Sequence, residues 1–152
     1  MTQIRLAQPK DWKQIAAMRV LLWPEASFEE HFAELEAGQS NPGQPGFPVV
    51  VLVSEGEHGT LSGFIEVGLR SHADGCDTQC PVGFIEGWFV FEARRGKGIG
   101  GELMRTAEAW ARDRGCLEMA SDALVDNPGS ERAHKALGFE VVDRCVHFRK
   151  AL

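Results

Sequence analysis

Apolar and polar residues follow two different periods along the chain, and each period predicts one type of element. Alternation with a period of two, or a continuous β-branched run, predicts strands at residues 3–8, 48–54, 61–69, 82–91 and 117–121, and a strand or hairpin at 139–149. Apolar residues at every third or fourth position predict helices at 9–23, 28–37, 99–112 and 130–137. Because strands and helices mix along the chain, the predicted fold class is α/β with a mixed central sheet.

Polar residues and glycines mark where these elements begin and end. Ser27 is followed three residues later by Glu30, and this spacing predicts a capping box at the start of the second helix. Gly38 is expected to end that helix. The stretch at 39–46 is rich in glycine and proline and predicts a surface loop, since too little chain precedes it to form a separate domain.

Length and composition indicate one globular domain over residues 1–152. The chain has 152 residues, 43% of them hydrophobic and 25% charged, which argues against disorder and against a coiled coil. Its longest apolar run, around 48–53, is far shorter than the roughly 20 residues that cross a bilayer, so we expect no membrane partner. The first residues lack the pattern of a secretory signal, and we therefore expect a cytoplasmic protein whose four cysteines are free thiols.

The charge balance favours some partners over others. Lys and Arg number 16 and Asp and Glu number 22, which gives a formal net charge of -6. Such a surface repels a phosphate backbone and attracts cations, so we expect no nucleic acid and favour a cationic small molecule. Many soluble proteins carry a similar charge, so the net charge favours such a partner without identifying it.

The segment with the clearest chemistry is 89–101, where a strand, a basic glycine-containing turn and a helix start follow one another. Unpaired amides at a helix start, the helix dipole and the close backbone approach that glycine allows together suit a pyrophosphate. An ordinary strand-to-helix turn with basic residues for solubility is the alternative. The turn lacks the Ser or Thr of a P-loop, and it does not follow the first strand as a dinucleotide-binding turn does.

Two acidic residues are candidates for binding or deprotonating an amine. Glu86 lies within an apolar strand, and on alternation it shares a face with Phe84 and Trp88. A carboxylate there needs a charged or hydrogen-bonding partner, which can be an internal arginine or a substrate ammonium whose proton Glu86 accepts. Asp122 comes at the carboxyl end of a strand, where ligands of open α/β sheets collect, although an aspartate there is often a turn residue.

A metal site is the other chemistry to consider. His72, Cys76 and Cys80 could supply three zinc ligands from one loop, but no fourth ligand is evident and their spacing differs from that of common zinc sites. We therefore expect no metal. Cys116 and Cys145 flank predicted strands and are expected to be core residues.

The basic turn resembles that of a known family. Arg95-Gly96-Lys97-Gly98-Ile99-Gly100 matches the Arg/Gln-x-x-Gly-x-Gly/Ala turn of the GCN5-related N-acetyltransferases (GNATs), and the order of strands and helices is similar over the whole chain. The turn is moderately specific for the family. Five flanking segments are more specific and resemble the aminoglycoside 6'-N-acetyltransferases within it, namely 22–24, 75–77, 84–87, 118–122 and 134–139.

This resemblance implies how acetyl-CoA would bind. A GNAT fold has a splayed pair of parallel strands, here 82–91 and 117–121, flanked by about four helices, and the pantetheine arm enters between the two strands. Backbone groups of Trp88, Phe89 and Val90 would bond the pantetheine, and Asn127 matches a position that contacts the cofactor. Amides of the turn would hold the pyrophosphate, those of Arg95, Gly96, Lys97, Gly98, Ile99 and Gly100.

The resemblance also implies the reaction, acetyl transfer to the 6'-amine of an aminoglycoside antibiotic, which confers resistance. The amide N–H of Val90 would polarise the thioester carbonyl, while Glu86 and Asp122 would bind the cationic substrate. Other substrate-binding residues would be Trp23, His72 and Asp143. Likeness to the family further suggests a homodimer in which C-terminal strands, around 141–149, meet or exchange.

Two features leave alternatives open. The chain has no tyrosine, whereas many GNATs use a tyrosine in the last helix to protonate the departing thiolate, and His134 occupies that neighbourhood. A thiol with a pKa near 8.5 is a tolerable leaving group without an acid, so transfer is still feasible. The other interpretations are acetylation of a different small amine, such as a polyamine, or of a protein N-terminus, and a binding module that senses acetyl-CoA without transfer.

Overall fold

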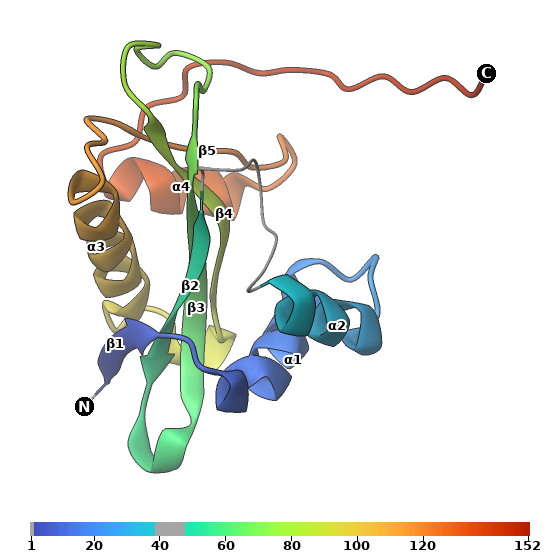
Figure 1. The fold of residues 1–152 in the computed structure, drawn as a ribbon, viewed down its shortest axis with the longest axis vertical. Coiled ribbons are helices and arrows are strands. Elements are labelled where there is room, and N and C mark those ends of the chain that lie inside the picture. Colours follow the sequence, from blue (N-terminus) through green and yellow to red (C-terminus); the bar gives the residue numbers. More distant parts are fainter. Residues whose placement is uncertain (1, 39–47) are drawn as a thin grey trace.

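A five-stranded sheet forms the centre of the molecule (Figure 1). The computed structural model describes residues 2–38 and 48–152, so the loop expected at 39–46 lies outside the described residues. The strands are β1 (Gln3–Leu6), β2 (Val49–Glu55), β3 (Leu61–Arg70), β4 (Val82–Val90) and β5 (Met119–Ser121). They pair in sequence order, antiparallel from β1 to β4, and only β4 and β5 run parallel. The sheet is therefore mixed, as the sequence predicts.

Four α-helices cover the two faces of this sheet. Figure 1 shows the first two on one side and the third on the other. Each lies within a few residues of its predicted position: α1 (Trp12–Leu22), α2 (Phe28–Gly38), α3 (Ile99–Arg112) and α4 (Pro128–Ala136). Three short 3-10 turns complete the described elements: η1 (Pro9–Asp11), η2 (Glu57–Gly59) and η3 (Glu92–Arg94).

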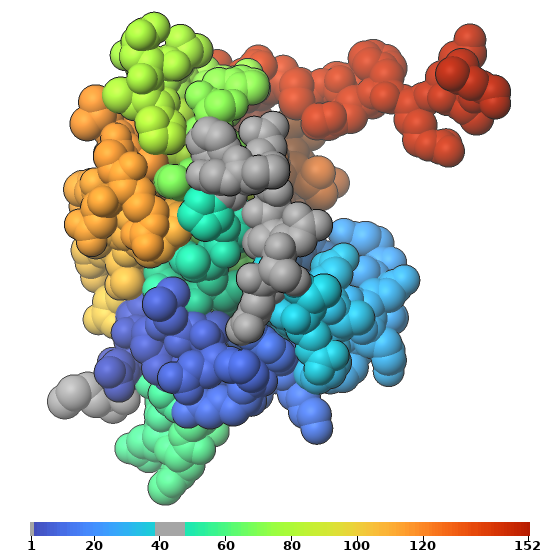
Figure 2. Space-filling model, viewed as in Figure 1, coloured from blue at the N-terminus to red at the C-terminus, as the bar shows by residue number. Residues whose placement is uncertain are grey.

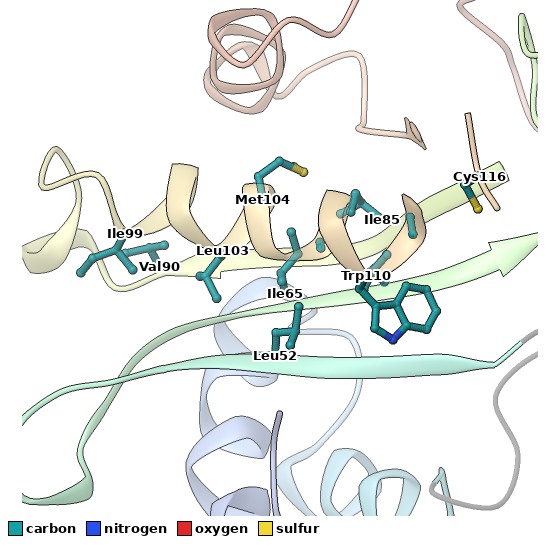
Figure 3. Packing of buried hydrophobic residues seen from close by; sticks show 12 residues of the cluster. Leu52, Ile65, Ile85, Val90, Ile99, Leu103, Met104, Trp110 and Cys116 are labelled. Atoms are coloured by element: carbon teal, nitrogen blue, oxygen red, sulfur yellow. The ribbon is translucent and has the colours of Figure 1, made fainter. Parts of the chain in front are cut away.

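The sheet separates two hydrophobic clusters. Neighbouring residues of β3 point to opposite faces, so Phe64 packs with α1 and α2 while Ile65 packs with α3. Figure 3 shows the second cluster, in which Leu103 and Trp110 of α3 lie over the strands. Cys116 is buried at its edge, as expected. Because each cluster has its own helices, the two faces of β4 can present different chemistry.

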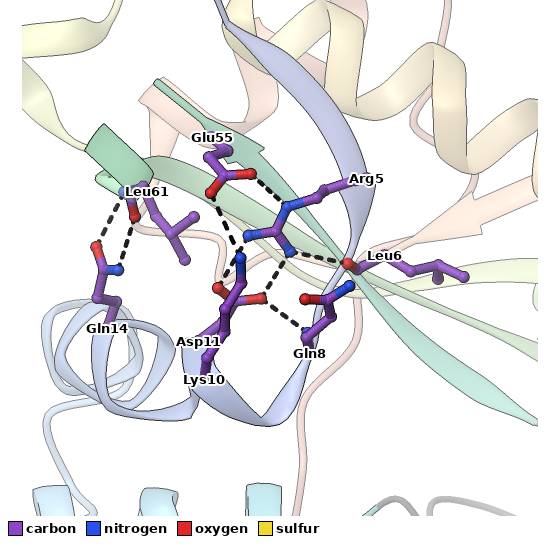
Figure 4. A network of polar contacts seen from close by, with 9 residues as sticks. Arg5, Leu6, Gln8, Lys10, Asp11, Gln14, Glu55 and Leu61 are labelled. Atoms are coloured by element: carbon purple, nitrogen blue, oxygen red, sulfur yellow. Dashed lines mark hydrogen bonds and ion pairs between the residues drawn. The ribbon is translucent and has the colours of Figure 1, made fainter. Parts of the chain in front are cut away.

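A polar network fixes the start of the chain on the sheet (Figure 4). The guanidinium of Arg5 binds Asp11 Oδ2 at 2.7 Å and also pairs with Glu55 of β2. Asp11 in turn accepts the Gln8 N–H at 2.7 Å, which satisfies an amide ahead of η1. The hydrogen bonds from Arg5 hold the pKa of the Asp11 carboxyl below its ordinary value. This network joins β1, β2 and the turn that leads into α1.

The helix boundaries confirm one sequence prediction in detail. The Glu30 N–H donates to Ser27 Oγ at 3.1 Å, and the Ser27 N–H donates to a carboxylate oxygen of Glu30 at 2.7 Å. These two reciprocal bonds are the capping box predicted for α2.

The predicted strand or hairpin at 139–149 is wrong for the single chain. No residue of 139–152 belongs to a strand, and Figures 1 and 2 show the end of this C-terminal tail extending away from the body. Phe139 still packs against the core, but apolar side chains further along are exposed, Val146 by 76% and Phe148 by 94%, and Cys145 is exposed rather than in the core. The reason is that a strand needs a partner for its N–H and C=O groups, and none of the described strands pairs with this segment.

Candidate active site

The parallel strands β4 and β5 separate midway along β4. Only three residue pairs join β4 to β5, and Ile85 with Ser121 is the last of them. β4 continues to Val90, so its residues from Glu86 onward have no strand beside them on the β5 side, within the part of the chain that the structure describes. An open strand edge offers N–H and C=O groups to an extended ligand. β4 and β5 therefore form the splayed pair of parallel strands that the sequence resemblance implies.

A β-bulge lies where the strands separate. On the β3 side Glu66 pairs with Gly87 and Val67 pairs with Ile85, so Glu86 is left without a partner in the ladder. The extra residue shifts the alternation of side chains along β4. Ile85 and Trp88 both pack toward α3, although an unbroken strand would place them on opposite faces.

The bulge corrects one prediction about Glu86. The Glu86 carboxylate and the Phe84 ring both contact Arg70, so they lie on one face of the sheet, as alternation predicts. Trp88 packs on the opposite face. The signal for this was present in Gly87, because an isolated glycine within a strand pattern often marks a bulge or a close backbone approach.

Glu86 is bound by an arginine of the neighbouring strand. Arg70 Nη2 donates to Glu86 Oε2 at 2.8 Å, and Nε and Nη2 both donate to Oε1. The guanidinium also lies over the ring of Phe84, 3.4 Å from its centroid. This is the internal partner that the sequence left as an alternative, yet the Glu86 side chain keeps 31% of its surface exposed. A ligand can therefore still reach the carboxylate.

Trp23 packs against the bulge from the end of α1. A Cβ atom added to Gly87 would lie 2.5 Å from the Trp23 ring, so the ring and the strand touch only because residue 87 is glycine. The Trp23 ring meets the Phe64 ring edge to face, with centroids 6.4 Å apart, and the His31 ring lies tilted to it, with centroids 6.2 Å apart. The structure thus places Trp23 against Gly87, the residue that follows Glu86, on the face that α1 and α2 cover.

A buried ion pair holds α1 in this position. Arg19 Nε donates to Glu66 Oε1 at 2.7 Å, and both side chains are largely buried. The Arg19 guanidinium also lies over the Trp23 ring. Burial raises the pKa of Glu66 above its ordinary value, and the positive charge of Arg19 opposes that shift. No local pattern indicates this pair, because the two residues are far apart along the chain.

The basic turn presents open amides at the start of α3. Gly96 and Gly98 have φ values of 74° and 82°, which favour glycine, and added Cβ atoms there would meet nothing within 4 Å. The helix has no side-chain cap, and its first backbone bond runs from the Glu102 N–H to the Gly98 carbonyl. Arg95 Nε donates to the Val90 carbonyl at 2.9 Å and so ties the turn to the end of β4. The arrangement suits an anion.

Comparison with known proteins agrees with this geometry. The family model of the acetyltransferase (GNAT) family matches residues 12–139. The chain belongs to the GNAT family. Its mixed sheet, parallel β4–β5 pair and four helices are the GNAT fold expected from the sequence.

Several relatives of this GNAT share one name. This chain is 38% identical to an aminoglycoside N(6')-acetyltransferase type 1 of Klebsiella aerogenes, over 98% of this chain and 96% of the relative. It is 39% identical to the protein of the same name from Stenotrophomonas maltophilia, over 98% and 93% of the two chains. A solved structure of AAC(6')-Iy in complex with the bisubstrate analogue CoA-S-monomethyl-acetylneamine matches with a TM-score of 0.87, 29% identity, and coverage of 100% of this chain and 99% of that one.

On the face of the sheet that α3 covers, His134 of α4 contacts both β4 and β5 where the two strands separate. The His134 ring meets the Trp88 ring edge-on, with centroids 5.2 Å apart. Its Nε2 lies 2.8 Å from Ser121 Oγ, and its Nδ1 lies 2.7 Å from the Ser130 carbonyl oxygen. The sequence placed His134 near the leaving group, but Ser121 was missed because nothing local distinguishes it.

The remaining predicted residues of the GNAT site lie at its surface. Asp122 follows β5 directly and is exposed, and His72 is exposed in the loop after β3 beside Ser71. Asp143 lies in the C-terminal tail, where its carboxylate accepts the N–H of the next residue. Asn127 Oδ1 accepts the Ser130 N–H at 3.1 Å and so caps α4. Among the described contacts, none joins these four side chains to Glu86.

Two further findings concern metals and membranes. The described residues contain no group of three or more His, Cys, Asp or Glu side chains that could hold a metal ion. All four cysteines are free thiols. No helix in the described ranges is both long and apolar enough to cross a membrane.

Proposed function

We propose that this GNAT transfers the acetyl group of acetyl-CoA to the 6'-amine of aminoglycoside antibiotics and thereby confers resistance. One observation carries the proposal: the β4–β5 gap lies between the open amides of α3 and the acidic bulge at Glu86. An acyl donor held along the gap would present its thioester to an amine bound at the bulge. The names of the relatives support an aminoglycoside as the acceptor.

The cofactor side of this site fits a CoA thioester. We expect backbone groups of Trp88, Phe89 and Val90 to bond the amides of pantetheine, and the alternation of the β3 ladder turns those of Trp88 and Val90 toward the unpaired edge. The turn from Arg95 to Gly100 offers its amides to the pyrophosphate, with the α3 dipole favouring negative charge. We place Asn127 beside the cofactor as well, since one side of its amide stays available while its Oδ1 caps α4.

The acceptor side fits a polycation. Glu86 would bind the substrate ammonium and accept its proton directly or through water, because only the neutral amine attacks a thioester. The new C–N bond then forms as the C–S bond breaks, with the Val90 N–H polarising the carbonyl oxygen. Asp122, Asp143 and His72 would contact the remaining charged or polar groups, and the Trp23 ring would contact the sugar. The formal net charge of -6 favours such an acceptor.

The assembly and its location belong to the same proposal. We expect a homodimer in which the exposed apolar C-terminal tail pairs with a second copy, which would give its backbone groups the partner that one chain lacks. We also expect the enzyme to act in the cytoplasm, where acetyl-CoA is made and used.

The test is release of CoA from acetyl-CoA in the presence of kanamycin or tobramycin, compared with matched compounds that carry a hydroxyl at the 6' position. Turnover only with the 6'-amines supports both the reaction and its position. Turnover with spermidine or a peptide N-terminus but with no aminoglycoside contradicts the proposed acceptor. Binding of acetyl-CoA without CoA release from any amine contradicts catalysis and favours a sensor.

One prediction tests the amide site. Replacing Gly98 with alanine is expected to raise the KM for acetyl-CoA by about tenfold, the scale of one hydrogen bond to a charged group. The reason is that φ at residue 98 is 82°, which strains any side chain and tilts the first amides of α3. Initial rates at varied acetyl-CoA measure the effect. Gly115→Ala is the matched control, because Gly115 has φ 85° and open space at the other end of α3, so the same strain there should leave this KM unchanged.

A further inference from the structure

His134 bridges the two strands where they separate. Its ring contacts Trp88, which lies on β4 beyond the last pair with β5, and its Nε2 reaches Ser121, the last residue of β5. Glu86 lies across the sheet, on the α1 and α2 face. The serine and histidine therefore approach the gap from the side opposite to the acceptor.

The hydrogen bonds of the ring define which nitrogen carries a proton. The Ser130 carbonyl oxygen can only accept, so His134 Nδ1, at 2.7 Å from it, must be the protonated donor. Nε2 can then exist in two forms. In the neutral ring it accepts the Ser121 O–H, and in the charged ring it donates to Ser121 Oγ, which leaves the hydroxyl hydrogen free for a third group.

We propose that Ser121 protonates the departing CoA thiolate and that His134 supplies the proton. The assignment rests on the acetyl transfer proposed above. When the C–S bond breaks, sulfur keeps the electron pair and takes the hydrogen of the Ser121 hydroxyl. Ser121 Oγ takes the proton from His134 Nε2, and the ring becomes neutral while Nδ1 stays bonded to the Ser130 carbonyl. Solvent then restores the ring proton.

The surroundings of the ring suit this role. Trp88 and Phe139 meet it edge-on, with centroids 5.2 and 5.3 Å apart, and Ser130 and Ser121 occupy its nitrogens. None of these four residues titrates near neutral pH. On the same helix, Glu131 pairs with Lys135 at 2.8 Å and with Arg144 of the C-terminal tail at 3.1 Å. His134 is thus the proton donor that these contacts bring to Ser121.

The kinetic test separates proton supply from mere support of the fold. His134→Gln keeps a side-chain N–H able to bond Ser121 but has no exchangeable acid, so we expect kcat to fall about 10- to 100-fold. The dependence of kcat on pH should also differ between this variant and the wild-type enzyme. Ser121→Ala should lose as much, and His58→Gln, at an exposed histidine of η2, should lose nothing. A His134→Gln enzyme with wild-type kcat and pH profile overturns the proposal.

A binding test does not depend on the acceptor. Wild-type protein should bind CoA about three- to tenfold more tightly than desulfo-CoA, which lacks the sulfur, because Ser121 hydrogen-bonds that atom. Ser121→Ala should bind the two compounds equally, and this small change at a half-buried residue is unlike a core deletion. An equal preference in both proteins overturns the proposal. If wild-type protein releases no CoA with any amine, the proposed function fails, and this comparison still decides the role of Ser121.

Discussion

Replacing Arg19 with methionine is expected to lower the free energy of unfolding by about 3–5 kcal/mol at neutral pH. The change removes the partner of Glu66, which is only 6% exposed, and so leaves an uncompensated carboxylate inside the protein. It also removes the cation over Trp23. Urea unfolding followed by tryptophan fluorescence measures the loss, with the midpoint and the slope fitted separately.

The pH dependence identifies the cause of that loss. Burial already raises the pKa of Glu66, and loss of Arg19 raises it further. A carboxyl with a raised pKa in the folded state costs no stability below its unfolded pKa, and the cost grows as pH rises through its folded pKa. The variant should therefore be closer to wild type at pH 5 than at pH 7.5.

Two controls accompany the measurement. Combining Arg19→Met with Glu66→Leu should recover most of the stability, since a buried ion pair can be replaced by apolar residues at little cost. Arg112→Met removes an exposed partner of Glu108 and should cost less than about 1 kcal/mol. An equal loss for Arg19→Met at both pH values would show that lost packing, rather than the buried charge, is the cause.

Replacing Glu86 with glutamine is expected to lower kcat/KM for a 6'-amino aminoglycoside by about 100-fold or more. The amide keeps the shape of the carboxyl but neither binds an ammonium as an anion nor accepts its proton. In addition, the Arg70 guanidinium loses the group that neutralises it and remains as a bare cation on the acceptor face. Initial rates at varied aminoglycoside, with acetyl-CoA at saturation, measure the effect.

A double variant separates the two causes. Adding Arg70→Gln to Glu86→Gln removes the uncompensated cation, so KM for the aminoglycoside should recover in part while kcat stays low. Glu108→Gln removes one negative charge from α3, away from the bulge, and should leave both constants near wild type. Unchanged kcat/KM in Glu86→Gln would restrict Glu86 to its ion pair with Arg70.

The sequence predicted most of the fold because its local signals agree with one another. The strand and helix patterns, the Ser27–Glu30 capping box and the glycine turn before α3 all appear where they were expected. Each depends on residues within a few positions of one another, where propensity and capping act directly. The strand or hairpin predicted at 139–149 was wrong because its pattern indicates a strand but does not supply the partner strand.

Less of the candidate site than of the fold could be predicted from the sequence. Alternation assigned Glu86 and Trp88 to one face, and a single unpaired residue in the ladder puts them on two. The partners of Glu86 and of Glu66 come from other strands and helices, and no spacing rule connects residues that meet only in the folded chain. Ser121 acquires its candidate role only because α4 carries His134 to it.

The bulge has an implication for how the acceptor range of such an enzyme can change. Because one extra residue in β4 turns Glu86 and Gly87 toward α1 while Trp88 and Val90 face α3, substitutions on the first side leave the acetyl-CoA side undisturbed. With the acceptor bound as we propose, we expect substitutions around Trp23 to change the antibiotic preference one residue at a time. A one-residue deletion in this stretch would instead exchange the two faces at once, and we expect such deletions to be eliminated by selection.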